Sequence, residues 1–212
     1  MKVSGLFTAK VTRIGPKNER TGIYKYPCEQ AVIDQLGMLG DVQIDKRYHG
    51  GPERALHQYS ISSYEKIIKA YPLLHKKAWP GSMGENLSIA QMHENNVCIG
   101  DTYQIGECKI QVSGPRMPCF KIAEKFNTPN LNKFVAKQAI HGWYYRVLKG
   151  GKIALNDNVK LTDRPNPVVS IEKFLEVVQN KVSDTGRIKQ TINAIDLDPE
   201  WREKLCKQFS LT

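Results

Sequence analysis

The sequence predicts a mainly β fold of the α+β class, followed by a small domain of three helices. Residues 1–163 consist largely of short apolar runs bounded by Gly, Pro, Asn and Asp, which is typical of a β-barrel or sandwich. After residue 170 the apolar residues recur with helical spacing instead. The length of 212 residues suits one medium domain with a small appendage.

Several segments of the first part are rich in Val, Ile, Tyr and Thr, the residues that strands favour. These segments are residues 2–11, 54–60, 85–89, 96–106, 108–113, 143–148 and 159–163. Helical periodicity indicates two helices between them. The first spans residues 61–71, with Ser62 or Ser63 as its cap, and the second spans 131–140, with Asn130 or Asn132 near its start. A third helical run follows Cys119.

The segment 164–170 is predicted to be a linker, because it contains two prolines two residues apart. Three helices are expected after it, and they form a C-terminal domain over residues 171–212. Ser170, Ser183 and Asp198 are suitable N-caps, and Pro199 suits a first helical position. The helices are expected over residues 170–180, 183–195 and 198–209.

The net charge of +10 is concentrated in the first part of the chain, since residues 165–212 carry as many basic as acidic side chains. An excess of positive charge favours an anionic ligand. No RNP, KH or zinc-finger signature is present, which argues against stable nucleic-acid binding.

Five cysteines without a C-x-x-C spacing indicate free thiols in a reducing compartment. No signal peptide and no membrane-spanning run is recognisable, so we expect a cytoplasmic protein.

The stretch SGPRMPCFKI contains the residue with the clearest chemical potential, Cys119. Pro115 and Pro118 stiffen the segment before it. A helix N-terminus and Arg116 would both favour the thiolate, which is a nucleophile and a ligand for soft metals. Alternatively, Cys119 is an ordinary buried apolar residue.

Two further motifs lie before predicted strands. In RYHGGPER, His49 and Arg54 flank Gly50 and Gly51, and an arginine beside a glycine-rich turn can clamp a phosphate. In GENL, Gly84 precedes Glu85 and Asn86, whose side chains can orient a ligand by hydrogen bonds. Each motif is also compatible with a plain turn.

Taken together, KRYHGGPERAL, GENL, SGPRMPCFKI and GWYYRVLKGGKI resemble the MOSC-domain family, and in particular its YiiM-like bacterial members. The resemblance extends over residues 1–163, and the three helices resemble the small domain that follows in that subgroup. It implies a MOSC-type β-barrel that binds the molybdenum cofactor, a molybdopterin. Ser113, Pro115, Arg116, Pro118 and Cys119 match the pattern that ends in the molybdenum-ligating cysteine.

The family implies an oxidoreductase that removes the hydroxyl oxygen from N-hydroxylated bases, amidoximes or hydroxylamines, a detoxification. Cys119 is then the molybdenum ligand, while His49 or Glu85 passes a proton. The cofactor-binding residues are expected to be His49, Gly50, Gly51, Arg54, Gly84, Asn86, Ser113 and Arg116.

Electrons must come from a separate flavin- or iron–sulfur-type protein, since the chain has no G-x-G-x-x-G fingerprint after a strand. Two alternatives remain at this point. The chain could be a non-catalytic carrier of the cofactor, or a sulfur-transfer protein that uses a Cys119 persulfide.

Overall fold

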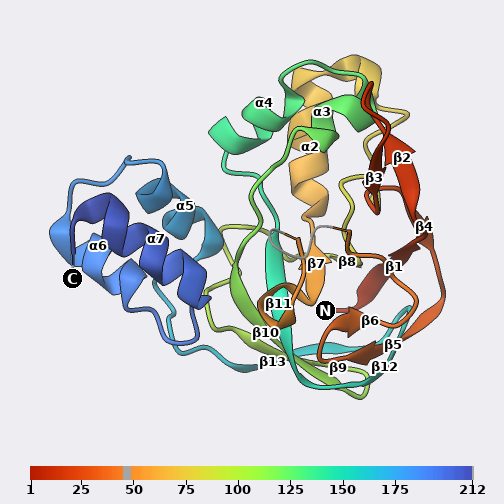
Figure 1. Cartoon of the computed structure of the whole chain (residues 1–212). Coiled ribbons are helices and arrows are strands. Elements are labelled where there is room, and N and C mark those ends of the chain that lie inside the picture. Colours follow the sequence, from red (N-terminus) through yellow and green to blue (C-terminus); the bar gives the residue numbers. More distant parts are fainter. Residues whose placement is uncertain (45–48, 212) are drawn as a thin grey trace.

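The computed structural model describes residues 1–44 and 49–211, and it has the expected α+β fold. An eight-stranded sheet in the order β13-β9-β10-β11-β7-β8-β1-β4 curls into a half-barrel (Figure 1). Its neighbours pair antiparallel except β7 and β8, which are parallel. Smaller sheets, β12-β5-β6 and β2-β3, complete the β structure. The first residues of the KRYHGGPERAL motif lie outside the described residues.

The strands are short, as the many turn residues predict. They are β1 (Val3–Ala9), β2 (Thr12–Ile14), β3 (Glu19–Thr21), β4 (Lys25–Pro27), β5 (Gln30–Asp34), β6 (Gly37–Met38), β7 (Leu56–Gln58), β8 (Leu87–Ile89), β9 (Thr102–Ile105), β10 (Cys108–Pro115), β11 (Trp143–Lys149), β12 (Gly151–Ala154) and β13 (Val159–Asp163).

The helices form two groups at different sides of the large sheet (Figure 1). One group is α2 (Ile61–Ala70), α3 (Lys121–Phe126) and α4 (Leu131–Lys137), with the 3-10 turns η1 (Pro52–Arg54) and η2 (Pro72–Leu74) nearby in the chain. The other group is α5 (Ile171–Val178), α6 (Thr185–Ile192) and α7 (Pro199–Phe209). The three expected C-terminal helices are therefore present.

Some local expectations were wrong. The long apolar run 96–106 is a strand only over β9, and the residues before it form turns. Ser60 rather than Ser62 or Ser63 is the N-cap of α2, because the Ser63 hydroxyl bonds the buried carboxylate of Glu94. Asp184 rather than Ser183 caps α6, and its carboxylate accepts two backbone N–H bonds.

One continuous hydrophobic core joins the sheet to the C-terminal helices. Ile171, Phe174 and Leu205 belong to the same buried cluster as strand residues such as Val112 and Trp143. The segment before α5 is also tied to the sheet: the Ile99 N–H donates to the Val169 carbonyl over 3.0 Å, and Cys98 forms a β-bridge with Ser170. The helices therefore cover apolar surface of the half-barrel.

In the part of the chain that the structure describes, no helix combines the length and apolar character needed to cross a bilayer.

The shared core predicts that a chain ending at Asp163 will not form a native half-barrel. Removal of the three helices uncovers side chains that are now fully buried, at about 25 cal/mol for each Å² of apolar surface exposed. We expect little soluble protein, and a loss of near-UV circular dichroism in what is recovered. A soluble truncated chain with a cooperative thermal transition like that of the full chain would contradict this expectation.

Candidate functional site

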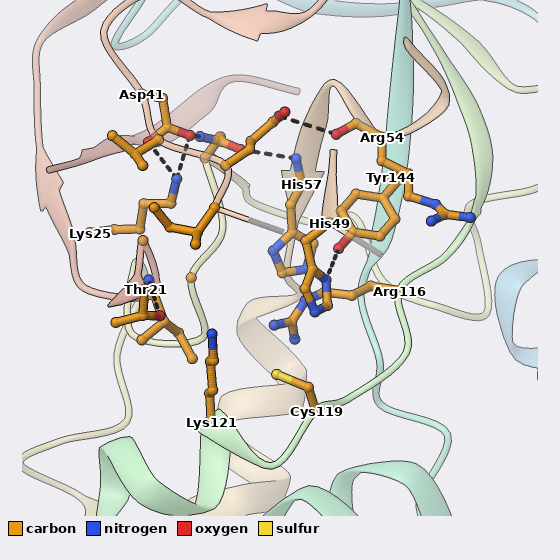
Figure 2. A pocket seen from close by; sticks show the side chains of 17 residues that line it. Thr21, Lys25, Asp41, His49, Arg54, His57, Arg116, Cys119, Lys121 and Tyr144 are labelled. Atoms are coloured by element: carbon orange, nitrogen blue, oxygen red, sulfur yellow. Dashed lines mark hydrogen bonds and ion pairs between the residues drawn. The ribbon is translucent and has the colours of Figure 1, made fainter. Parts of the chain in front are cut away.

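An open pocket lies where the end of β10, the start of α3 and the loops after β3 and β6 come together (Figure 2). It encloses about 620 Å³ of empty space, a volume that includes open solvent at its mouth. Its lining residues are Thr21, Gly22, Ile23, Lys25, Asp41, Val42, Gln43, Ile44, His49, Arg54, His57, Gly84, Asn86, Arg116, Cys119, Lys121 and Tyr144.

Cys119 lies in the short connection between β10 and α3. The Arg116 N–H donates to the Gly142 carbonyl over 3.2 Å, which anchors the start of this connection. The Cys119 carbonyl accepts the N–H of Ile122 over 3.1 Å, so Cys119 stands just before the first turn of α3. Its side chain is half-buried and its sulfur points into the pocket (Figure 2). The thiol is therefore accessible to a ligand in the pocket.

The guanidinium group of Arg116 lies beside the Cys119 sulfur (Figure 2). Arg116 is only 6% exposed, and among the described residues its Nη1 has no hydrogen-bond partner. Burial works against its charge, but the neighbouring Tyr144 and Cys119 outweigh it and raise the pKa of Arg116. A buried cation with an unsatisfied donor is chemically suited to an anionic oxygen.

His57 provides a second unsatisfied atom in the same pocket. Within the described residues its Nε2 has no hydrogen-bond partner, and the residue is 4% exposed. Burial, assisted by the charge of Arg116, lowers the pKa of His57 well below its ordinary value. The imidazole is therefore neutral and can offer either a donor or an acceptor, according to its tautomer.

Lys25 and Asp41 form a buried ion pair on the opposite wall. Their side chains are each 4% exposed, and Lys25 Nζ lies 2.5 Å from Asp41 Oδ2. Asp41 also accepts hydrogen bonds from the Ala9 N–H and from Asn86 Nδ2. Burial lowers the pKa of Lys25, while Asp41 works against this shift. Asn86 is thus placed at the pocket by the pair.

His49 and Tyr144 are joined by a hydrogen bond of 2.9 Å between Nδ1 and the phenol oxygen (Figure 2). Both side chains line the pocket. Burial raises the pKa of Tyr144, although Arg116 opposes this. Tyr144 therefore stays protonated at neutral pH, and its hydroxyl can relay a proton to or from His49.

Arg54 lines the pocket, but its guanidinium group points away from Cys119 (Figure 2). Its Nη2 lies 3.3 Å from Asp198 Oδ2 and 2.5 Å from Glu200 Oε2, both from the start of α7. The side chain therefore links the pocket wall to the C-terminal helices.

The other sequence-predicted residues are Gly50, Gly51, Glu85 and Ser113. The Ser113 hydroxyl donates to the Glu53 carbonyl over 2.5 Å, and Gly50 and Gly51 lie next to η1. Glu85 is fully buried, and burial raises its pKa. None of these four lines the pocket.

Glu85 instead organises the loop that supplies Gly84 and Asn86. Its carboxylate accepts bonds from the Tyr64 hydroxyl over 2.5 Å and from the N–H groups of Gly81 and Met83 over 2.6 and 3.1 Å. Gly84 adopts a φ of +84°, which favours glycine at this position. The structure therefore brings together His49, Arg54, Gly84, Asn86, Arg116 and Cys119.

Sequence reasoning missed Lys25, Asp41, His57, Lys121 and Tyr144. Lys25 and Asp41 lie in a region without a recognised motif, and only the fold pairs them. His57 and Tyr144 lie on the adjacent strands β7 and β11, where they pair directly across the ladder. The sequence predicted both segments as strands, and this was the only signal that could have pointed to His57 and Tyr144.

The pocket fits an anionic cofactor that needs one protein sulfur ligand. Among the residues that the structure describes, four cationic side chains and a single carboxylate line it. No cluster of three or more His, Cys, Asp or Glu side chains suited to a metal ion occurs among the described residues. The Cys119 thiol, the unsatisfied Arg116 Nη1 and the cationic wall therefore suit a metal that is carried by an anionic organic group.

Comparisons with known proteins give relatives over nearly the whole chain. It is 32% identical to the uncharacterized protein YflK of Bacillus subtilis, over 91% of this chain and 86% of that protein. It is 28% identical to the protein YiiM of Escherichia coli, over 96% and 90%. A protein of Gibberella moniliformis named as a reductase is 33% identical over 90% of this chain, which spans only 35% of that longer protein.

The fold comparison agrees with these sequences. The crystal structure of YiiM from Geobacillus stearothermophilus matches 100% of this chain and 99% of its own, with a TM-score of 0.80 and 25% identity. The family model of the MOSC domain matches residues 45–160, which include His49, Glu85, Arg116 and Cys119. The chain is therefore a YiiM-like member of the MOSC domain family.

Proposed function

We propose that this protein binds the molybdenum cofactor in the pocket around Cys119 and reduces N-hydroxylated compounds. The observation that carries the proposal is the position of a half-buried thiol beside a buried guanidinium whose Nη1 lacks a partner among the described residues (Figure 2). A thiolate is a suitable ligand for a soft metal, and the guanidinium is suited to an anionic oxygen beside it.

Each part of the pocket has a role in holding the cofactor. Cys119 is the molybdenum ligand, and Arg116 binds an anionic group of the cofactor. Lys121 adds positive charge at the start of α3, and Asn86, fixed by Asp41, offers its amide group. When bound, the cofactor would supply a two-electron redox centre. The protein supplies position, charge and protons.

The proposed reaction converts R–NHOH, two electrons and two protons to R–NH2 and water, so the chain must deliver protons into the pocket. The contacts favour His49 over Glu85 for this role. His49 lines the pocket and is hydrogen-bonded to the Tyr144 hydroxyl, whereas Glu85 is fully buried and holds three donors behind the wall.

Electrons would reach the site from a separate flavin- or iron–sulfur-type protein. Two apolar side chains on either side of Cys119 are exposed, Met117 at 40% and Phe120 at 52%. Exposed apolar residues beside a redox centre are suited to a transient contact with a donor protein. The name of the Gibberella relative agrees with reductase chemistry.

The first prediction separates Cys119 from the other cysteines. Cys119→Ala and Cys119→Ser should abolish reduction of an N-hydroxylated base by the cofactor-loaded protein with an artificial electron donor. Cys28→Ala and Cys206→Ala remove half-buried thiols outside the pocket and should keep substantial activity. Substantial activity of Cys119→Ala would rule out the proposed mechanism.

Metal content and a sulfur adduct distinguish the two alternatives. Full molybdenum content in the wild-type chain without turnover of any N-hydroxylated substrate would indicate a carrier. A mass increase of one sulfur on Cys119, without molybdenum, would indicate persulfide chemistry.

The second prediction concerns the arginines. Lysine lacks the planar fork with which arginine binds an oxyanion through two bonds. Arg116→Lys should weaken cofactor binding on the order of tenfold or more, since a charge-assisted hydrogen bond contributes ~1.5–3 kcal/mol, and the molybdenum content should fall below that of the wild type. A direct role of Arg54 in binding stays a prediction, tested in the same way by Arg54→Lys.

Arg187→Lys is the matched control, because Arg187 lies on α6 and pairs with Glu176 at the surface. Its molybdenum content should equal that of the wild type. Wild-type content in both Arg116→Lys and Arg54→Lys would show that neither arginine clamps the cofactor.

A further inference from the structure

Helix α7 contacts the half-barrel at both segments that flank the pocket. One segment is the end of β10, which leads into Arg116 and Cys119. The other is η1, which ends at Arg54. The pocket is therefore bordered by residues whose positions depend on a helix more than eighty residues further along the chain.

Trp201 is the contact with the end of β10. Its indole Nε1–H donates to the Pro115 carbonyl over 3.2 Å, and Pro115 directly precedes Arg116. The ring also covers Gly114, where a Cβ atom would lie 2.7 Å from the ring carbon Cδ1. Glycine is thus needed at 114 for the close approach of the indole. Trp201 in turn packs edge-on against Phe174, with 5.4 Å between the two ring centroids.

Asp198 ties α7 to both segments. Its backbone N–H donates to the Ser113 carbonyl over 2.9 Å, and its carboxylate pairs with Arg54. The same carboxylate caps α7 by accepting the Glu200 N–H over 2.9 Å. The Asp198 side chain is 3% exposed, so its pairing with Arg54 is shielded from water.

A third contact links η1 to the segment before α7. Arg146 pairs with Glu53 of η1 and also donates to the Asp196 carbonyl over 2.8 Å, just before α7. Both ends of the pocket wall are thus bound to the same stretch of the C-terminal helices.

We propose that α7 and its N-cap position the site. Trp201 and Asp198 hold the Cys119 segment and η1 in place relative to each other. The proposal uses the proposed function only in taking Cys119 as the reactive group. It assigns the C-terminal helices a role in addition to covering apolar surface, since it makes the environment of the Cys119 thiol depend on Trp201 of α7 and on Asp198, the N-cap of that helix.

Thiol alkylation of the full-length chain tests this without any cofactor. Iodoacetamide is added to folded protein, and the rates at Cys119 and Cys28 are measured in the same molecule by peptide mass. Cys28 is a half-buried cysteine that does not line the pocket, so it reports general loosening of the fold. The ratio of the two rates therefore reports changes in the accessibility of Cys119 that are not caused by general loosening of the fold.

Three variants are compared with the wild type. Trp201→Phe keeps an aromatic ring but removes the bond to Pro115, and Asp198→Asn keeps a helix cap but removes the charge opposite Arg54. Glu203→Gln is the matched control, because Glu203 is exposed on the same helix and pairs with Lys207. Thermal unfolding of each variant is recorded in parallel.

We expect the ratio of Cys119 to Cys28 alkylation to rise at least threefold in Trp201→Phe and in Asp198→Asn, and to stay unchanged in Glu203→Gln. Asp198→Asn carries the test alone if Trp201→Phe does not fold. A ratio within the wild-type range in the folded variants would overturn the proposal, as would an equal rise in Glu203→Gln. Because no molybdenum is involved, either result leaves the proposed reductase function to its own tests.

Discussion

The buried guanidinium group of Arg116 is the constraint on which this site depends. A cation that is taken out of water is costly unless charges or hydrogen bonds compensate it. Burial works to lower the pKa of Arg116, Tyr144, Cys119 and Tyr59 work to raise it, and Nη1 has no hydrogen-bond partner among the described residues. An anionic ligand would complete this arrangement, and the thiol beside it would then be in place to bind a metal.

Segments that are far apart in the sequence together form the pocket. The ladder between β7 and β11 sets His57 opposite Tyr144, and the Lys25–Asp41 pair fixes Asn86 on the facing wall. The Glu85 carboxylate, behind this wall, draws its loop together through three donors. Among the described residues, the pocket lining has more cationic than anionic side chains, which favours an anionic ligand.

Much of this could be predicted from the sequence where local chemistry decides structure. Runs of β-branched and aromatic residues located most strands of the large sheet, and Ser170 and Asp198 marked the starts of α5 and α7 as N-caps. The proline-flanked Cys119 stood out because its signal is contained in a few adjacent residues. The strands β2 to β6 and β12 were missed, because each is short and none lies in a run of β-branched and aromatic residues long enough to recognise.

Contacts between distant residues could not be predicted in this way. Nothing near Arg54 in the sequence indicates that Asp198 and Glu200 will turn its guanidinium group toward α7. Glu85 was expected to face the ligand. The sequence around a carboxylate next to a glycine turn is the same whether the side chain faces a pocket or the protein interior. Burial decided its position, and burial depends on the whole fold.

The most direct test of the account is the molybdenum content of the purified chain. The protein is produced in a host that makes the molybdenum cofactor and in a matched host that does not, and the metal is measured per chain. We expect about one molybdenum for each chain from the first host and none from the second, as for a site with one thiol ligand. Protein from the first host that is folded but contains no molybdenum would contradict the assignment of this pocket to the cofactor.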